Sequence, residues 1–306
     1  MSVYSLDLDE PALVRNGIEV ISFDTSELDF AAEVRRLLVD KGFTNAECEL
    51  VDLHKFISQE DQRFDIHLLN NVTKAFYETS TAFREFYLGL ITQLASSSLT
   101  GDFLFQETPT MRFHFPAPLP DQFRDRTGRY LGHHNDGMLG HSHDEINCWL
   151  PLTDCRGSAA LEMVDFDTSI AALKEFFSWV NNDAEMYSRK GRGLFFELLT
   201  TDESYGSRII DACRPLPMRY GELLVFDSRC LHAPAENIGD ETRISFDFRI
   251  IPLERYEHRT HEFRSAGRSG RSFSRGDIYA MKSGRELLGE RAAESQMTQT
   301  LAGVKE

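Results

Sequence analysis

The feature that most constrains the fold is a segment of strict alternation between polar and apolar residues. It runs Arg243, Ile244, Ser245, Phe246, Asp247, Phe248, Arg249, Ile250. A period of two with this composition predicts a β-strand, because successive side chains of a strand point to opposite faces. In the ordinary interpretation the polar face lies in water and the apolar face in a core. In the other, which we favour because a histidine precedes the segment, Arg243 and Ser245 face a bound anion inside a small barrel.

A second strand is predicted just upstream, over Gly221–Phe226. The chain then passes His232 and enters a turn, indicated by Pro234, Asn237, Gly239 and Asp240. We therefore expect a hairpin that places His232 close to Arg243 across the turn.

Residues that commonly bind metal ions occur in an order and spacing that rarely arise by chance. His134-Asn135-Asp136 offers a histidine and a carboxylate, and His232 follows after a long excursion. Two histidines and one carboxylate on one side of an octahedral ion form the facial triad of non-haem Fe(II) oxygenases. Arg243 then adds a planar fork that can hold a carboxylate of a dicarboxylate cosubstrate. His-x-Asp alone is typical of an exposed polar turn, so the prediction depends on the whole order.

Taken together, these motifs resemble the 2-oxoglutarate/Fe(II)-dependent dioxygenases. The resemblance is to the phytanoyl-hydroxylase-like branch that includes hydroxylases of streptomycin-type antibiotic pathways, and it covers roughly residues 105–250. The segments that carry it are Thr108-Pro-Thr-Met-Arg-Phe-His114, His134-Asn-Asp136, His141, Glu145-Ile-Asn-Cys-Trp-Leu-Pro-Leu-Thr153, Leu161-Glu162, His232, Asn237 and Arg243-Ile-Ser-Phe-Asp-Phe-Arg249.

The resemblance implies a mainly β fold with flanking helices, a double-stranded β-helix of the cupin-like, jelly-roll type. It implies that His134, Asp136 and His232 hold Fe(II). It also implies that Arg243, Ser245 and Asn147 bind 2-oxoglutarate, with O₂ as the oxidant. The substrate pocket is expected to include Arg112, His114, His141 and Trp149. A pair of solvent-facing side chains remains the alternative for Arg112 and His114, and a solvated loop remains the alternative for His141.

A second His-x-carboxylate sequence, His143-Asp144-Glu145, offers another choice of metal ligands. We prefer His134 and Asp136 because the metal pair of the family lies well before the strand that contains Trp149, whereas His143 is close to it. Glu145-Ile-Asn147 also matches a separate element of this branch.

The activity that the resemblance implies is oxidation of an unactivated C–H bond of a small molecule in specialised metabolism, with hydroxylation first. Desaturation, cyclisation or epimerisation by an oxidase of the same family is the alternative. Halogenation is disfavoured because Asp136 fills the position that a halide would need. An alternative of another class is a non-catalytic jelly-roll binding protein, against which the presence of all three ligands and Arg243 argues.

We expect a single domain over residues 1–306. Residues 1–100 would provide helical support, with helices over 28–39 and within 61–94, and 101–250 the jelly-roll core with a helical insertion at about 166–207. A tail over 251–306 contains Arg255, Arg259, Arg264, Arg268, Arg271 and Arg275, and ends in a helix-like segment over 285–297. The tail is either a flexible surface segment or a lid that brings an arginine to an anionic substrate.

The composition disfavours some classes of binding partner. The net charge of −16 disfavours nucleic acid and anionic membranes, because both are negatively charged. The five cysteines show no paired spacing, which indicates reduced thiols. The beginning of the chain lacks a signal-peptide pattern and no apolar run reaches membrane-spanning length, so we expect a cytoplasmic protein. The expected partner is a small-molecule substrate, free or carrier-tethered; the sequence makes no prediction about oligomeric state.

Overall fold

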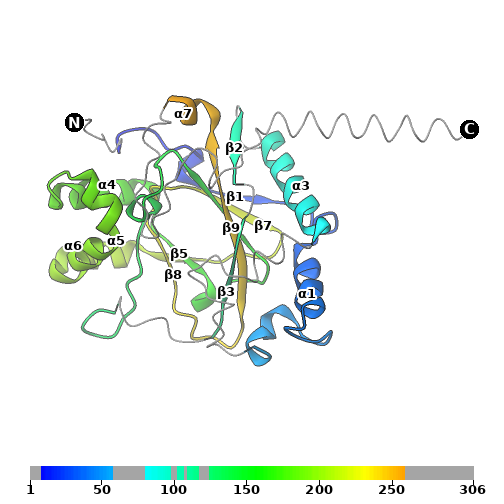
Figure 1. The fold of residues 1–306 in the computed structure, drawn as a ribbon. Coiled ribbons are helices and arrows are strands. Elements are labelled where there is room, and N and C mark those ends of the chain that lie inside the picture. The colour runs from blue at the N-terminus through cyan, green and yellow to red at the C-terminus, as the bar shows by residue number, and fades with distance from the viewer. Residues whose placement is uncertain (1–7, 58–79, 98–101, 107–108, 117–123, 259–306) are drawn as a thin grey trace, which may run out of the picture.

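A computed structural model describes residues 8–57, 80–97, 102–106, 109–116 and 124–258 of the chain. Two antiparallel sheets lie at its centre and helices cover both sides (Figure 1). The strands are β1 (Ile18–Ser22), β2 (Phe103–Phe105), β3 (Thr110–His114), β4 (Ile146–Pro151), β5 (Leu161–Met163), β6 (Arg214–Leu216), β7 (Glu222–Asp227), β8 (His232–Pro234) and β9 (Arg243–Pro252). The helices are α1 (Phe30–Asp40), α3 (Thr81–Ser97), α4 (Phe166–Trp179), α5 (Ala184–Thr201), α6 (Glu203–Ala212) and α7 (Leu253–His258).

The strand order is that of a jelly roll. The large sheet has the order β1-β7-β4-β9-β2, and β3 also pairs with β9. The small sheet has the order β6-β5-β8, and a bridge between His134 and His232 adds a further chain segment beside β8. From β3 to β9 the chain passes repeatedly from one sheet to the other, as in a double-stranded β-helix. The predicted fold class is confirmed.

The predicted hairpin between His232 and Arg243 is wrong. His232 begins β8, which pairs with β5 in the small sheet, whereas Arg243 begins β9, which pairs with β4 in the large sheet. The turn between them carries the chain from one sheet to the other, so the two residues lie on facing sheets.

The apolar face of β9 is covered by helices. The ring of Phe246 lies 5.0 Å from that of Phe30 in α1 and 5.9 Å from that of Phe83 in α3. The opposite face of the strand then points between the two sheets, where Arg243 and Ser245 are buried. The ordinary interpretation of the alternation, with the polar face in water, is therefore wrong for these two residues. Residues of β9 alternate between a helix-covered face and the interior of the barrel.

Three helices between β5 and β6 cover the other side of the barrel (Figure 1). Each begins at an aspartate whose carboxylate accepts a backbone N–H of the first turn: Asp165 for α4, Asp183 for α5 and Asp202 for α6. The insertion runs from Phe166 to Ala212, slightly beyond the predicted end.

Several predictions concern residues outside the described part of the chain. These are the first part, up to residue 79, of the one long helix or two packed helices predicted over 61–94, the helix-like segment over 285–297 and the tail arginines from Arg259 onward. Arg255 is described, and its guanidinium contacts Glu10 and lies 3.7 Å from a carboxylate oxygen of Asp144. Among the described helices, none has the length and apolar character to cross a membrane.

Candidate functional site

Three predicted metal ligands come together between the sheets. Each of His134, Asp136 and His232 offers a ligand atom, and these atoms lie within 4.8 Å of one another. The two histidines are backbone partners, with N–O distances of 3.0 and 2.9 Å, so the bridge beside β8 fixes their relative position. Asp136 lies two residues further on, at the start of the short 3₁₀ helix Asp136–Leu139.

Both histidine rings are oriented by backbone carbonyls. Nδ1 of His134 lies 2.8 Å from the carbonyl oxygen of Gly132, and Nδ1 of His232 lies 3.0 Å from that of Cys230. A carbonyl only accepts hydrogen bonds, so these contacts assign the proton to Nδ1 and leave the Nε2 lone pair for a metal. Burial also lowers the pKa of His134 well below its ordinary value. Its ring is therefore neutral, which is the form that binds metals.

Asp136 is held by an arginine from the large sheet. Nε and Nη2 of Arg249 donate to the same carboxylate oxygen, Oδ2, at 2.9 and 2.8 Å. The other oxygen, Oδ1, lies 3.6 Å from Nε2 of His232. Burial acts to raise the pKa of Asp136, but Arg249 and the neighbouring histidines hold it well below its ordinary value. The site thus combines an ionised carboxylate with two imidazoles whose Nε2 atoms can bind a metal, a donor set that fits Fe(II).

The alternative histidine, His143, lies outside this cluster. Its Nε2 is 3.1 Å from the hydroxyl of Tyr187 in α5. His141, by contrast, lies beside the cluster, with Nδ1 3.0 Å from a carboxylate oxygen of Glu145. Asp136, His141 and Glu145 also form a compact group. The structure therefore brings together the preferred set of residues and places His141 next to it, not in a solvated loop.

A buried arginine lies at the beginning of β9, with no carboxylate partner in the part of the chain that the structure describes. Nη1 of Arg243 donates to the carbonyl oxygen of Ala159 at 3.1 Å, but its Nε has no hydrogen-bond partner among the described residues. Ser245 Oγ and Asn147 Oδ1 are also buried, and they too have no hydrogen-bond partner among the described residues. Burial lowers the pKa of Arg243 to about 10, so the guanidinium remains charged. A buried cation two residues from the unsatisfied hydroxyl of Ser245 is costly unless a ligand completes the site, and a carboxylate fits; Asn147 lies further along the sheet, opposite Arg249.

The remaining predicted pocket residues surround this arginine. Strand β3 lies antiparallel to β9, with Arg112 opposite Ser245 and His114 opposite Arg243. Arg112 is paired with Asp247 through hydrogen bonds of 2.7 and 3.4 Å. The ring of Trp149 in β4 lies 5.9 Å from the guanidinium carbon of Arg243. Arg112 and His114 are thus neighbours of the two β9 residues predicted to bind the cosubstrate.

Sequence reasoning missed two residues that support the cluster. Arg249 stands on the polar face of the alternating segment, but nothing in the sequence pairs it with Asp136. Tyr187 lies in the insertion, and its hydroxyl donates to Oδ1 of Asn135 at 2.9 Å. Asn135 lies within the His-x-Asp motif, so its burial could have been suspected; Tyr187 has no comparable signal.

Comparisons with known proteins return enzymes and a biosynthetic protein of the expected kind. No family model matches the chain. The streptomycin biosynthesis protein StrG of Streptomyces griseus is 22% identical over 240 residues, which cover 78% of this chain and 86% of that protein. Among solved structures, the non-haem α-ketoglutarate-dependent carbocyclase SnoK from nogalamycin biosynthesis is 12% identical, with a TM-score of 0.40 over 87% of this chain and 92% of that one. EvdO2 of Micromonospora carbonacea, complexed with 2-oxoglutarate, is 12% identical, with a TM-score of 0.38 over 78% and 86%.

The fold class is assigned from the strand order of this chain. The identities and TM-scores only state how similar the other proteins are to it. The predicted resemblance is confirmed: the chain is similar to the non-haem, 2-oxoglutarate-dependent oxygenases.

Proposed function

We propose that this protein is an Fe(II)- and 2-oxoglutarate-dependent dioxygenase that oxidises an unactivated C–H bond of a small molecule in specialised metabolism, most simply by hydroxylation. The observation that carries the proposal is the buried guanidinium of Arg243, which has no carboxylate partner among the residues that the structure describes. It lies in the same barrel as the cluster of His134, Asp136 and His232. A metal site alone fits many functions. A metal site together with a buried receptor for a carboxylate fits a dicarboxylate cosubstrate.

Each residue has a distinct task in this proposal. His134, Asp136 and His232 would hold iron, which with 2-oxoglutarate and O₂ would supply the oxidation of the C–H bond. Arg243 would pair with the far carboxylate of 2-oxoglutarate, and Ser245 would donate a hydrogen bond to it. The unsatisfied Oδ1 of Asn147 would accept a hydrogen bond from a bound molecule or water.

The substrate side of the site would be polar. Arg112 and His114 of β3 flank the arginine pocket, and His141 lies beside Asp136. We propose that these residues, with Trp149, contact a polar substrate, free or carrier-tethered. The sequence similarity to StrG supports an antibiotic-type pathway. The cytoplasm, where 2-oxoglutarate is available, is the proposed location.

The proposal is tested by adding Fe(II) and then 2-oxoglutarate to the protein without oxygen. A weak visible charge-transfer band is expected only when both bind at one centre. Admission of oxygen with a pool of candidate substrates should then give succinate and a product, to be identified by mass. A product heavier by one oxygen atom supports hydroxylation, whereas loss of two hydrogen atoms indicates desaturation or ring closure. A protein that binds neither iron nor 2-oxoglutarate would instead be a non-catalytic jelly-roll binding protein.

A further inference from the structure

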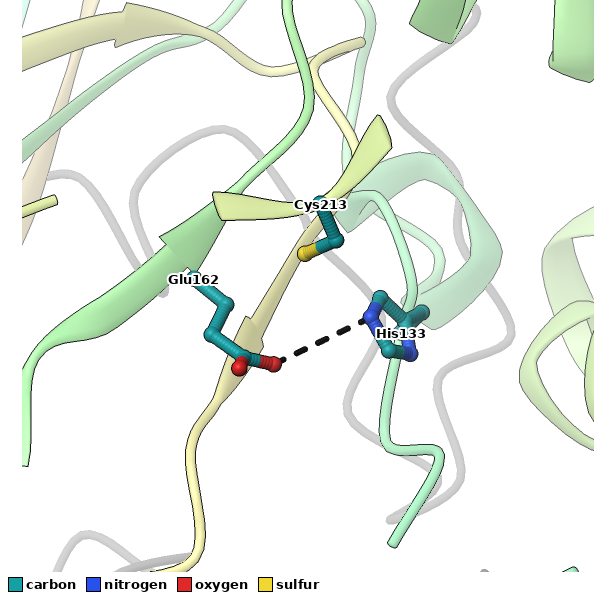
Figure 2. Close-up of side chains that lie close together, drawn as sticks. All are labelled: His133, Glu162 and Cys213. Carbon is teal, nitrogen blue, oxygen red and sulfur yellow. Dashed lines mark ion pairs between the residues drawn. The ribbon is translucent and has the colours of Figure 1, made fainter. Parts of the chain in front are cut away.

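A second group of metal-binding residue types lies on the outer side of the small sheet. It consists of His133, Glu162 and Cys213 (Figure 2). Successive residues of an extended chain point to opposite faces, so His133 points away from the barrel when His134 points into it. Glu162 lies in β5 between Leu161 and Met163, which both pack in the core that contains Trp149. Its side chain therefore also points outward.

The third residue comes from the end of the helical insertion, where the chain returns to the small sheet. Cys213 directly follows α6 and packs in the core that the helices of the insertion form. Three separate parts of the chain thus contribute to this group. Their potential ligand atoms all lie within 4.8 Å of one another, and Nε2 of His133 is 3.9 Å from Oε2 of Glu162.

The buried imidazole of His133 lacks hydrogen-bond partners among the described residues. Only 2% of this residue is exposed, and neither ring nitrogen has a hydrogen-bond partner among the described residues. The distance to Glu162 exceeds that of a hydrogen bond, although Figure 2 shows that the ring faces the carboxylate. Buried polar groups nearly always have a partner, because leaving one unpaired costs free energy. A ligand between the three side chains would satisfy the ring.

The pKa shifts of Cys213 and Glu162 favour a site that binds a cation over one with a nucleophilic thiol. Burial raises the pKa of Cys213 to about 12 and also raises the pKa of Glu162. A thiol of this kind is protonated at neutral pH, which argues against a Cys-His-Glu arrangement for nucleophilic attack. A divalent cation would stabilise both anionic forms, and its binding would release the thiol proton. The charges of Arg129 and Arg214 act in the opposite direction to burial and lower the pKa of Cys213.

We propose that His133, Glu162 and Cys213 form a second metal site, suited to zinc. Imidazole nitrogen, carboxylate oxygen and thiolate sulfur are the donor atoms that Zn²⁺ takes, with water available for a fourth position. Zinc bond lengths place tetrahedral ligand atoms about 3.3–3.6 Å apart, so small side-chain rotations close the present separations. This inference does not depend on the proposed function of the barrel interior.

The site would connect the helical insertion to the barrel. Cys213 caps the last helix of the insertion, Glu162 belongs to the small sheet, and His133 precedes the candidate iron ligand His134. A metal bound by all three would fix α6 against the sheet and hold the backbone of His134 from behind. Its role would be structural and positioning.

Cobalt titration of the full-length protein tests the proposal, because Co²⁺ bound by a thiolate gives a charge-transfer band in the near ultraviolet. The group of His134, Asp136 and His232 contains no thiol and gives none. We expect the band in the wild type and in Asp136→Ala, its loss in Cys213→Ser, and its retention in the matched control Cys48→Ser, which changes another buried cysteine. Added zinc should bleach the band, because nitrogen and sulfur sites bind zinc more tightly than cobalt.

Two results would overturn the second site: absence of the band in the wild type, or its persistence in Cys213→Ser. If Cys213→Ser does not fold, Glu162→Gln decides, because it keeps the thiol and the size of the side chain. Its apparent cobalt affinity should fall at least about tenfold; an unchanged titration contradicts the site. Failure of the Fe(II) and 2-oxoglutarate experiment leaves these outcomes unaffected, so the two proposals are distinguishable.

Discussion

Arg249 donates two hydrogen bonds to a single oxygen of Asp136, at 2.9 and 2.8 Å, and leaves the other oxygen 3.6 Å from Nε2 of His232. The arginine therefore determines which carboxylate oxygen faces the histidines. It also lies 3.3 Å from a carboxylate oxygen of Glu145, so one guanidinium from β9 contacts two buried carboxyl groups.

This relationship predicts the effect of Arg249→Leu on metal binding. Asp136 would remain but lose its orientation, and the iron affinity should fall about 10- to 100-fold, the usual effect of removing a residue that orients a ligand. Arg249→Lys keeps the charge without the planar fork, so its iron affinity should lie between that of Arg249→Leu and that of the wild type. Iron titration followed by calorimetry is the measurement. Equal affinities in all three proteins would separate Arg249 from the metal site.

Removal of a proposed iron ligand should reduce iron binding more than removal of a nearby histidine outside the cluster. Asp136→Ala should lose most of the bound iron and oxidation, because only two ligands remain. His143→Ala should bind iron nearly normally, since its ring contacts Tyr187 and not the cluster. Metal content after reconstitution checks both. Loss of iron in His143→Ala with iron retained in His134→Ala would favour the alternative ligand set.

Arg243→Leu should separate binding from stability. Truncating one partner of a buried charge pair costs about 2–5 kcal/mol, so the half-saturating concentration of 2-oxoglutarate should rise about 30-fold or more. Without the cosubstrate, the same variant removes a buried cation that has no carboxylate partner among the described residues, so Tm should stay the same or rise.

Arg112→Leu is the matched control, because Arg112 is paired with Asp247. Its removal leaves that carboxylate with the longer contact of 3.7 Å to Arg249 among the described residues, so Tm should fall by a few degrees. The two variants are compared in one series of thermal unfolding and 2-oxoglutarate titration. A fall in the Tm of Arg243→Leu as large as that of Arg112→Leu would show that Arg243 is a structural ion-pair residue.

The hydroxyl of Tyr187 connects the insertion to the proposed metal centre. Tyr187→Phe removes a hydrogen bond to buried Asn135 and leaves its amide oxygen one partner short, at a cost of about 1–3 kcal/mol. We expect a lower Tm and weaker iron binding, since Asn135 lies between His134 and Asp136. Phe177→Leu, which changes a partly buried residue of the same helical core, should lower Tm and leave iron affinity unchanged.

The apolar face of β9 should dominate stability. Phe246 is fully buried between α1 and α3, so Phe246→Ala should lower the free energy of unfolding by about 3–5 kcal/mol. Ile238→Ala, at a residue 80% exposed, should change it by less than about 0.5 kcal/mol. Urea unfolding followed by tryptophan fluorescence gives both values. A small effect of Phe246→Ala would mean that the helices do not pack firmly on β9.

The sequence was most informative where the signal is local. The alternation from Arg243 to Ile250 predicted a strand, because the side-chain period of a strand depends only on the backbone of consecutive residues. The order of His134, Asp136, His232 and Arg243 predicted a metal centre beside an anion pocket, because their chemistry is intrinsic to the residue types. The structure brings the three metal-ligand candidates together and buries Arg243.

Tertiary structure alone decided which groups meet. Period two does not tell which face of β9 is covered; α1 and α3, distant in sequence, cover the apolar face and leave the polar face to the interior. The turn after β8 looks like a hairpin, yet the strands it joins belong to different sheets. The contact of Arg249 with Asp136, and the grouping of His133 with Glu162 and Cys213, join segments far apart along the chain. Such contacts depend on the packing of whole layers, a property that no local pattern of residues encodes.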